Sequence, residues 1–263
     1  MSTTWFIFQN DNLLLTPSRT VPTGDVCPIT NESGNHVFSL TSTEGNACKA
    51  FSIPSDAPVG DLVPTDLRAS FNVLPRWQYL MAGKARELLF WHRNSMFCSC
   101  CGAPMAFHTD ISKRCTVCGR EVWPALSVAI IVAITRGDEI LLVQSKNFRA
   151  DYMGLVAGFV ETGETLEECV RREVMEETGL TIRRLRYVKS QPWPYPSGLM
   201  VGFRAEYDGG KLTLQRSELN KGGWFRFDNL PAIPGPVSLA RQLIDGWLEE
   251  KGVKSTSTQG CNK

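Results

Sequence analysis

The spacing of apolar residues changes along the chain and predicts regions of different structure. Residues 1 to about 70 contain short apolar clusters, among them "TWFIF", "LLL", "HVFSL" and "AFSIP", separated by Gly, Pro, Asp and Asn. Such clusters between turn residues are typical of short strands, so we predict a β-rich N-terminal domain. Residues 76–92 follow Pro75 and have apolar residues at helical spacing, namely Trp77, Leu80, Met81 and Leu88. This spacing predicts a helix packed on the core of that domain.

The second half of the chain alternates strand and helix patterns. The β-prone run "LSVAIIVAI" (126–134) is followed by "RGDE" and then "ILLVQS", which predicts a hairpin. A helix is expected over 165–178, and strands at "RRLRYVKS", "LMVGFRAEY" and "GGWFRF". A final helix, about 236–250, has one apolar face made of Ala240, Leu243, Ile244, Trp247 and Leu248. The last dozen residues are polar, and we expect them to be disordered.

Composition narrows the class of protein. The 263 residues are 43% hydrophobic and 21% charged, with a formal net charge of +1, as in an ordinary globular protein of one to three domains. The near-zero net charge gives no long-range field toward nucleic acid or an anionic membrane. No apolar run is long enough to span a bilayer, and the start lacks the pattern of a signal peptide. We therefore expect no membrane partner.

Five of the nine cysteines fall between positions 98 and 118. The odd total and this clustering argue against a secreted disulfide scaffold and for a metal site. Two C-x2-C pairs separated by 13 residues suit one tetrahedral ion, so we predict one structural Zn²⁺ per chain, bound by Cys98, Cys101, Cys115 and Cys118.

Other interpretations of this cysteine segment stay open. Cys100 would give a tighter C-x-C spacing, so we expect it not to be a ligand. Gly102 and Gly119 follow the two pairs, at positions that commonly need a permissive backbone. A redox C-x-x-C pair is one alternative, and a nucleic-acid-binding ribbon is another. The second rests only on the cations of the segment, Lys113, Arg114 and Arg120.

The helix predicted over 165–178 places acidic residues on its apolar side. Thr165 and Glu168 match a capping box, and Gly179 is a stop signal. At about 100° per residue, Glu173 and Glu177 project into or beside the apolar stripe of Leu166, Val170 and Val174, with Glu176 on its flank. A run of acids on a helix usually forms a solvated face. Here the acids share the side that faces the protein, so they need cations.

Arg172 can supply one positive charge, and a divalent metal ion can supply more. Hard oxygen ligands without nearby Cys or His indicate Mg²⁺ or Mn²⁺, which commonly bind waters and substrate phosphates as their remaining ligands. The acidic helix therefore predicts a metal and phosphate site.

Residues 158–180, "GFVETGETLEECVRREVMEETGL", resemble a complete Nudix box. The matching positions are Gly158, Glu164, Arg172, Glu173, Val174, Glu176, Glu177, Gly179 and Leu180. The resemblance implies an α/β/α sandwich around a mixed sheet that hydrolyses a nucleoside diphosphate linked to another group. It also implies that Glu173 and Glu177 bind metal, that Glu176 is a ligand or helps to activate water, and that Arg172 orients the carboxylates. The carbonyl group of Ala157 is implied as a further ligand.

"SQPWPYPSGLM" (190–200) follows ten residues later. Its alternating prolines stiffen it, so it could simply cap a core, or its aromatic rings could stack on flat rings of a substrate. It resembles the SQPWPFPxS signature of the NADH pyrophosphatase subfamily of Nudix enzymes, which also has an N-terminal domain and a four-cysteine ribbon. Tyr195 replaces the usual Phe, and Gly198 replaces the final Ser, which removes a hydroxyl group.

This second resemblance implies the substrate site. Residues expected to line the dinucleotide are Gln191, Pro192, Trp193, Pro194, Tyr195, Pro196, Ser197 and Gly198. Trp123 and Ala240 are implied as further substrate contacts, and Glu218 as a distal metal ligand. An exposed acid at Glu218 and a packed helix residue at Ala240 are the alternatives.

The sequence thus predicts a multidomain α+β protein. Its expected parts are an N-terminal β-rich domain (1–93), a zinc ribbon (94–124), a Nudix domain (125–251) and a disordered tail (252–263). The expected reaction is metal-dependent hydrolysis of NADH, and of NAD⁺, to nicotinamide mononucleotide and AMP. Removal of NAD caps from RNA as the main role is the alternative, and a non-catalytic zinc-ribbon module is a third reading. The family also implies a homodimer in the cytoplasm.

Overall fold

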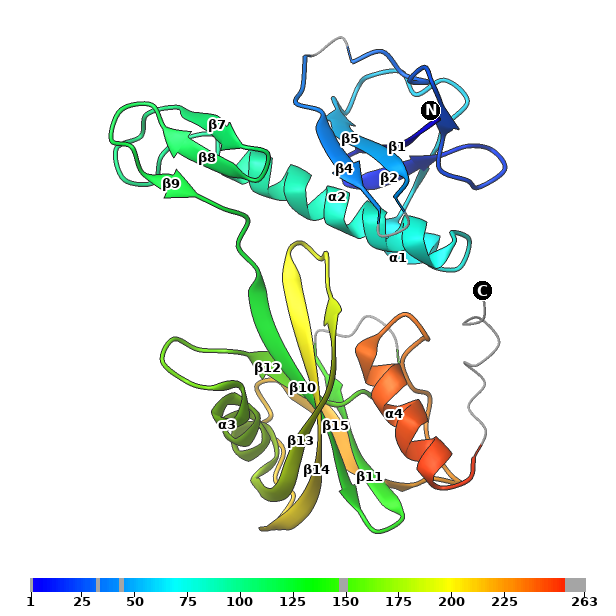
Figure 1. The fold of residues 1–263 in the computed structure, drawn as a ribbon. Helices are drawn as coiled ribbons and strands as arrows, with labels where there is room; N and C mark the ends of the chain where they lie inside the picture. The colour runs from blue at the N-terminus through cyan, green and yellow to red at the C-terminus, as the bar shows by residue number, and fades with distance from the viewer. Residues whose placement is uncertain (1, 32–33, 43–44, 147–150, 254–263) are drawn as a thin grey trace. The chain divides into compact units, whose positions relative to one another are not determined.

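The computed structural model describes residues 2–31, 34–42, 45–146 and 151–253 (Figure 1). The chain divides into two compact units. The first comprises Met1–Leu126 together with Trp193–Ser197, and the second comprises Ser127–Pro192 and Gly198–Lys263. Most of the tail predicted to be disordered, from residue 254 onward, lies outside the described residues. Within the described ranges, no helix is both long and apolar enough to cross a membrane.

The first unit contains a six-stranded sheet, as the apolar clusters predict. Its strands are β1 (Thr3–Gln9), β2 (Asn12–Leu15), β3 (Thr23–Gly24), β4 (Phe38–Thr41), β5 (Ala47–Ile53) and β6 (Val63–Thr65). Their order is β4-β5-β1-β2-β6, with β3 paired to β1. β1 lies in the middle, antiparallel to β2 and parallel to β5, and nearly all its side chains are buried. The β-rich N-terminal region is therefore confirmed.

Helix α1 (Leu67–Ser70) precedes the long helix α2 (Arg76–Asn94). Pro75 is the N-cap residue of α2, where its missing N–H is no loss because the first N–H groups of a helix have no partner within it. Met81 and Leu88 are buried as predicted, but Leu80 is 44% exposed. The prediction that Leu80 packs on the core is wrong, because the buried face of α2 instead passes through Tyr79, Ala82 and Ala85.

The cysteine segment forms a small three-stranded sheet. Its strands are β7 (Met105–Thr109), β8 (Ser112–Cys115) and β9 (Glu121–Val122), with β8 in the centre. Lys113 on β8 is buried, and its ammonium group donates to the carbonyl groups of His92 and Ser95 at 2.9 and 3.1 Å. These carbonyl groups lie at the end of α2, where a cation is favourable. Lys113 therefore holds the cysteine segment to the helix and is not a surface cation.

The second unit is a mixed six-stranded sheet between two helices (Figure 1). The strands are β10 (Ser127–Arg136), β11 (Glu139–Ser145), β12 (Val156–Phe159), β13 (Leu180–Pro192), β14 (Gly198–Gly210) and β15 (Leu219–Arg226). Their order is β13-β14-β10-β11-β15, with β12 paired to β10. β10 and β11 form the predicted hairpin, and β10 is parallel to β14.

Each face of this sheet has its own apolar core. Helix α3 (Leu166–Thr178) contributes Val170 and Val174 to one core, and α4 (Leu239–Glu250) contributes Leu243 and Ile244 to the other. Apolar residues alternate along β10 between the two cores, since successive side chains of a strand point to opposite faces. The predicted α/β/α sandwich around a mixed sheet is confirmed.

Candidate active site and cysteine cluster

Local sequence determines where α3 begins and ends. The Thr165 hydroxyl accepts from the Glu168 N–H at 3.2 Å, and the Glu168 carboxylate accepts from the Thr165 N–H at 2.8 Å. Gly179 ends the helix in the left-handed region, with φ of 68°, where a side chain would be unfavourable. Because both ends are set, the rotational position of each glutamate on α3 is set as well.

Arg172 connects the acidic groups of this helix. Its Nε and Nη2 donate to the two oxygens of Glu164, at 3.0 and 2.7 Å. Its Nη1 donates to Glu173 at 2.8 Å and to Glu176 at 3.1 Å, and Nη2 also donates to the Phe159 carbonyl at 3.0 Å. A planar guanidinium group is suited to such a network. Its hydrogen bonds are the main reason why the pKa of Glu164 falls to about 2.

Glu177 lacks such a compensating cation in the described structure. Its side chain is 5% exposed, and its Oε2 is buried without a hydrogen-bond partner. Burial, followed by the charges of Glu173 and Glu218, raises its pKa to about 8. Burial also raises the pKa of Glu173, against the lowering effect of Arg172. A buried carboxylate without a partner is costly, so the chemistry of this donor set fits a hard divalent cation.

Tertiary structure brings Glu218 to this group, although it lies 41 positions after Glu177 in the printed sequence. The Gln215 N–H donates to the Glu177 carbonyl at 2.9 Å, which ties the segment before β15 to the end of α3. The Gln215 side chain donates to the Glu218 carboxylate at 3.2 Å. The charge of Glu218 contributes to the raised pKa of both Glu173 and Glu177. Sequence reasoning did not identify Gln215, since no motif marks it.

Strand β12 provides the wall beside Glu173. A Cβ atom built on Gly158 would overlap the Glu173 carboxyl group, so a glycine is needed for this close approach. Ala157 precedes it and pairs with Ile131 on β10. The role of the Ala157 carbonyl as a metal ligand stays a prediction, as do the individual roles of Arg172, Glu173, Glu176, Glu177 and Glu218.

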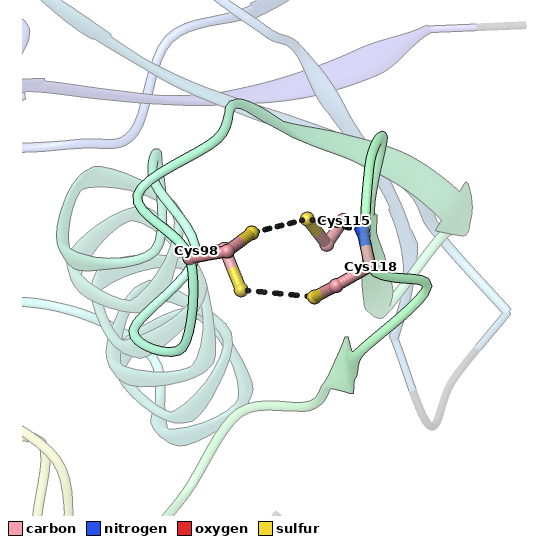
Figure 2. Close-up of side chains that lie close together, drawn as sticks. Cys98, Cys115 and Cys118 are labelled. Atoms are coloured by element: carbon pink, nitrogen blue, oxygen red, sulfur yellow. Dashed lines mark hydrogen bonds between the residues drawn. The ribbon is translucent and has the colours of Figure 1, made fainter.

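The cysteine cluster has the composition predicted. Ligand atoms of Cys98, Cys101, Cys115 and Cys118 all lie within 4.8 Å of one another. Figure 2 shows Cys98, Cys115 and Cys118 directed toward one another from two loops. The sulfur atoms of Cys98 and Cys118 are 3.6 Å apart, and those of Cys101 and Cys115 are 3.5 Å apart. Cys100 is exposed and outside the cluster, as expected.

The loops that carry these cysteines make tight turns, and the one after Cys115 stabilises a thiolate at that position. Gly102 and Gly119 have φ of 75° and 74°, which explains why a glycine follows each pair. The N–H groups of Val117 and Cys118 both lie 3.4 Å from the Cys115 sulfur. These backbone hydrogen bonds lower the pKa of Cys115 to about 6. Metal ions bind the thiolate form, so the cluster fits a four-cysteine metal site.

The proline-rich segment is divided between the two units. Gln191 and Pro192 end β13, and Gly198 begins β14, whereas Trp193–Ser197 belongs to the first unit. The Gln191 amide donates to the Val237 carbonyl at 2.7 Å, so Gln191 supports the segment before α4.

Two predicted substrate contacts lie outside this segment. The Trp123 side chain is 55% exposed, whereas Ala240 is 7% exposed and packs in the core beneath α4. Substrate contacts at Trp123, at Ala240 and along residues 191–198 stay predictions.

Comparison with known proteins agrees with this geometry. Residues 124–245 match the model of the NUDIX domain, and residues 2–91 match that of the NADH pyrophosphatase-like rudimentary NUDIX domain. The NAD-capped RNA hydrolase NudC of Yersinia pestis (strain Pestoides F) is 37% identical over 244 residues, which are 92% of this chain and 90% of the relative. NudC of Citrobacter koseri is 45% identical over 168 residues, 64% of this chain and 65% of the relative.

These matches cover both the N-terminal sheet and the sandwich that holds the acidic helix. The N-terminal match also relates residues 2–91 of the first unit to a rudimentary NUDIX domain, which the sequence pattern alone did not indicate. The chain has the complete box around α3, the glycine beside Glu173 and a relative that is 37% identical over 92% of this chain, so it belongs to the Nudix hydrolase family.

Proposed function

We propose that the protein hydrolyses the diphosphate linkage of NADH, and of NAD⁺, to give nicotinamide mononucleotide and AMP. The observation that carries the proposal is the buried, unpartnered Glu177 carboxylate beside Glu173 and Glu218. Such a group is explained if a divalent cation and a substrate diphosphate complete it. The resemblance of residues 190–198 to the NADH pyrophosphatase signature, and the names of the NudC relatives, support a dinucleotide substrate.

The reaction adds water across the diphosphate bridge. A water oxygen forms a bond to one phosphorus, and the bond from that phosphorus to the bridging oxygen breaks, so two monophosphates result and the water proton is released. A bound Mg²⁺ or Mn²⁺ supplies charge neutralisation and lowers the pKa of bound water. Ala157, Glu173, Glu176, Glu177 and Glu218 would hold it.

The protein's own residues prepare this chemistry. Arg172 fixes the orientation of Glu164, Glu173 and Glu176 through direct hydrogen bonds. Glu176 is 53% exposed, so it can accept a proton from an entering water. Glu177 must lose its proton before it can bind a cation, which favours binding as pH rises toward about 8.

Product analysis tests this function. NADH is incubated with the protein and Mn²⁺, and the products are separated by chromatography. Reduced nicotinamide mononucleotide and AMP in equal amounts are expected, with ¹⁸O from labelled water in one of them. Free nicotinamide would indicate glycosidic cleavage and refute the proposal, and no turnover would favour the non-catalytic reading. The Glu177→Gln variant is the control for a contaminating hydrolase.

Removal of an NAD cap from RNA is the same chemistry on a larger substrate. The printed names of the two relatives, NAD-capped RNA hydrolases, favour this second candidate. Competition between free NADH and a capped RNA, each in turn in excess, measures the preference. A higher kcat/KM for the RNA that falls with added salt would mean that the RNA body also contributes to binding.

Further parts of the proposal concern the metal, assembly and location. The cysteine cluster holds one Zn²⁺ per chain, which metal analysis of the purified protein tests. The enzyme is a cytoplasmic homodimer, which sedimentation and cell fractionation test. Limited proteolysis tests the division into residues 1–93, 94–124, 125–251 and a tail at 252–263.

A further inference from the structure

Tyr195 faces helix α2 within the first unit. Its hydroxyl lies 3.1 Å from the Tyr79 hydroxyl. The guanidinium groups of Arg68 and Arg86 lie 4.5 and 5.5 Å from the centre of its ring, distances at which cations are attracted to the face of an aromatic ring. Burial raises the pKa of both tyrosines, so the two hydroxyl groups stay neutral and hydrogen-bonded. Tyr195 is therefore occupied by partners from its own chain.

The backbone beside Tyr195 is held by the same helix. Arg86 donates a hydrogen bond to the Pro194 carbonyl. Pro194 also packs against Gly83, where an added Cβ atom would lie 3.1 Å from the proline ring. A glycine within a helix is unfavourable relative to alanine. The close approach of Pro194 gives a physical reason for a glycine at that position.

Arg86 also reaches the N-terminal sheet. Its guanidinium group lies 3.6 Å from the carboxylate of Asp11, in the turn between β1 and β2, and its side chain is 16% exposed. Arg93, seven residues further along α2, forms an ion pair with the same carboxylate at 3.5 Å. Arg86 contacts both Asp11 and the proline-rich segment, whereas Arg93 shares only the Asp11 contact among the described residues, so the two arginines form a matched pair.

We infer that α2 is the platform that fixes residues 193–197, that Arg86 and Tyr79 are positioning residues for this segment, and that Tyr195 is its anchor. On this view Tyr195 does not stack on the substrate. Arg68 also lies 5.0 Å from the centre of the Trp193 ring, so the same cation contacts both aromatic rings of the segment. The N-terminal domain then contributes to the reaction by holding the segment in place. The kinetic consequence rests on the proposed function, whereas the anchoring itself does not.

The anchoring is tested by hydrogen exchange of the peptide that spans residues 190–200. Arg86→Gln removes the donor to Pro194, and Arg93→Gln removes only an ion pair with Asp11. A hydrogen bond from a charged donor contributes about 1.5–3 kcal/mol, so exchange should be at least about tenfold faster in the first variant. Equal exchange in the two variants would overturn the inference.

A second pair of variants guards against misfolding of Arg86→Gln. Tyr79→Phe removes only the hydroxyl that contacts Tyr195. Tyr207→Phe is its control, because it removes a hydroxyl that donates to Gly210, outside this peptide. Exchange of the same peptide should accelerate in Tyr79→Phe and not in Tyr207→Phe. Circular dichroism confirms that each variant is folded, and an unchanged rate in folded Tyr79→Phe would exclude the tyrosine pair as an anchor.

Steady-state kinetics on NADH then separates positioning from chemistry. Because Arg86→Gln holds residues 193–197 less firmly, its KM should rise about tenfold, with kcat changed by less than about threefold. Faster exchange with unchanged KM would overturn the positioning role. Faster exchange in a protein whose parent does not hydrolyse NADH would sustain the anchoring and refute the proposed function.

Discussion

Replacement of Glu177 by glutamine should separate two effects of this buried carboxylate. In the metal-free protein its ionised form is destabilising, and in the metal-bound protein it holds the ion. Its pKa rises from 4.5 to about 8, chiefly because it is buried. Below pH 4.5 the group is protonated in both folded and unfolded chains and costs nothing. Between pH 4.5 and about pH 8 the carboxyl group is ionised in the unfolded chain but mostly protonated in the folded chain, so rising pH favours unfolding.

The size of this destabilisation follows from the shift in the pKa of Glu177. Each pH unit between the two pKa values costs the folded protein about 1.4 kcal/mol, and the cost per unit falls as the folded group itself begins to ionise near pH 8. Glu177 should therefore lower the free energy of unfolding by about 2 kcal/mol between pH 6 and pH 8. Glutamine cannot ionise. Metal-free Glu177→Gln should therefore become more stable than wild type, by a margin that grows with pH and levels off above about pH 8.

Urea unfolding at pH 6 and pH 8 measures this margin. The buffer is freed of Mg²⁺ with a chelating resin so that the cysteine site retains its own ion. Glu176→Gln is the control, because Glu176 is 53% exposed and should produce no comparable change. Millimolar Mg²⁺ should reverse the order, since only wild type keeps the full ligand set. A margin that does not depend on pH, or no reversal with Mg²⁺, would refute the reasoning.

Three further outcomes are expected. Arg172→Lys keeps the charge but loses the fork that holds several acids at once, so kcat should fall about 10–100-fold with the fold intact, as steady-state kinetics and circular dichroism will show. Gly158→Ala should lower metal affinity and activity, because the new methyl group would overlap a carboxyl group, whereas Gly235→Ala, which meets no atom within 4 Å, should not. Cys115→Ser should abolish zinc binding in metal analysis and lower the unfolding midpoint, whereas Cys100→Ser, outside the cluster, should retain one ion per chain.

Several features of the site were predictable because they depend on neighbours in the sequence. The capping box at Thr165 and the stop at Gly179 set the limits of α3, and the helical repeat then placed Glu177 on its buried side. The two C-x2-C pairs placed four sulfur atoms together for a similar local reason, since each short loop can present two ligands to one ion. These predictions needed only spacing and backbone geometry.

Other features depended on packing between distant segments. Periodicity placed Leu80 on the core, but the packing partners of α2 selected a different face. The sequence offered Lys113 as a cation for nucleic-acid binding, but the structure buries it where β8 packs against the end of α2.

By itself, the sequence determined the acidic helix, the cysteine loops and the order of strands and helices, since hydrogen bonds and spacing within a few residues decide them. The family resemblance implied Glu218 as a metal ligand, but only the tertiary structure decided that its charge acts on Glu173 and Glu177, that Gln215 supports it, and that Tyr195 contacts Tyr79. Those contacts join segments far apart in the chain. Their partners are chosen by which surfaces become buried together, and no local pattern records that choice.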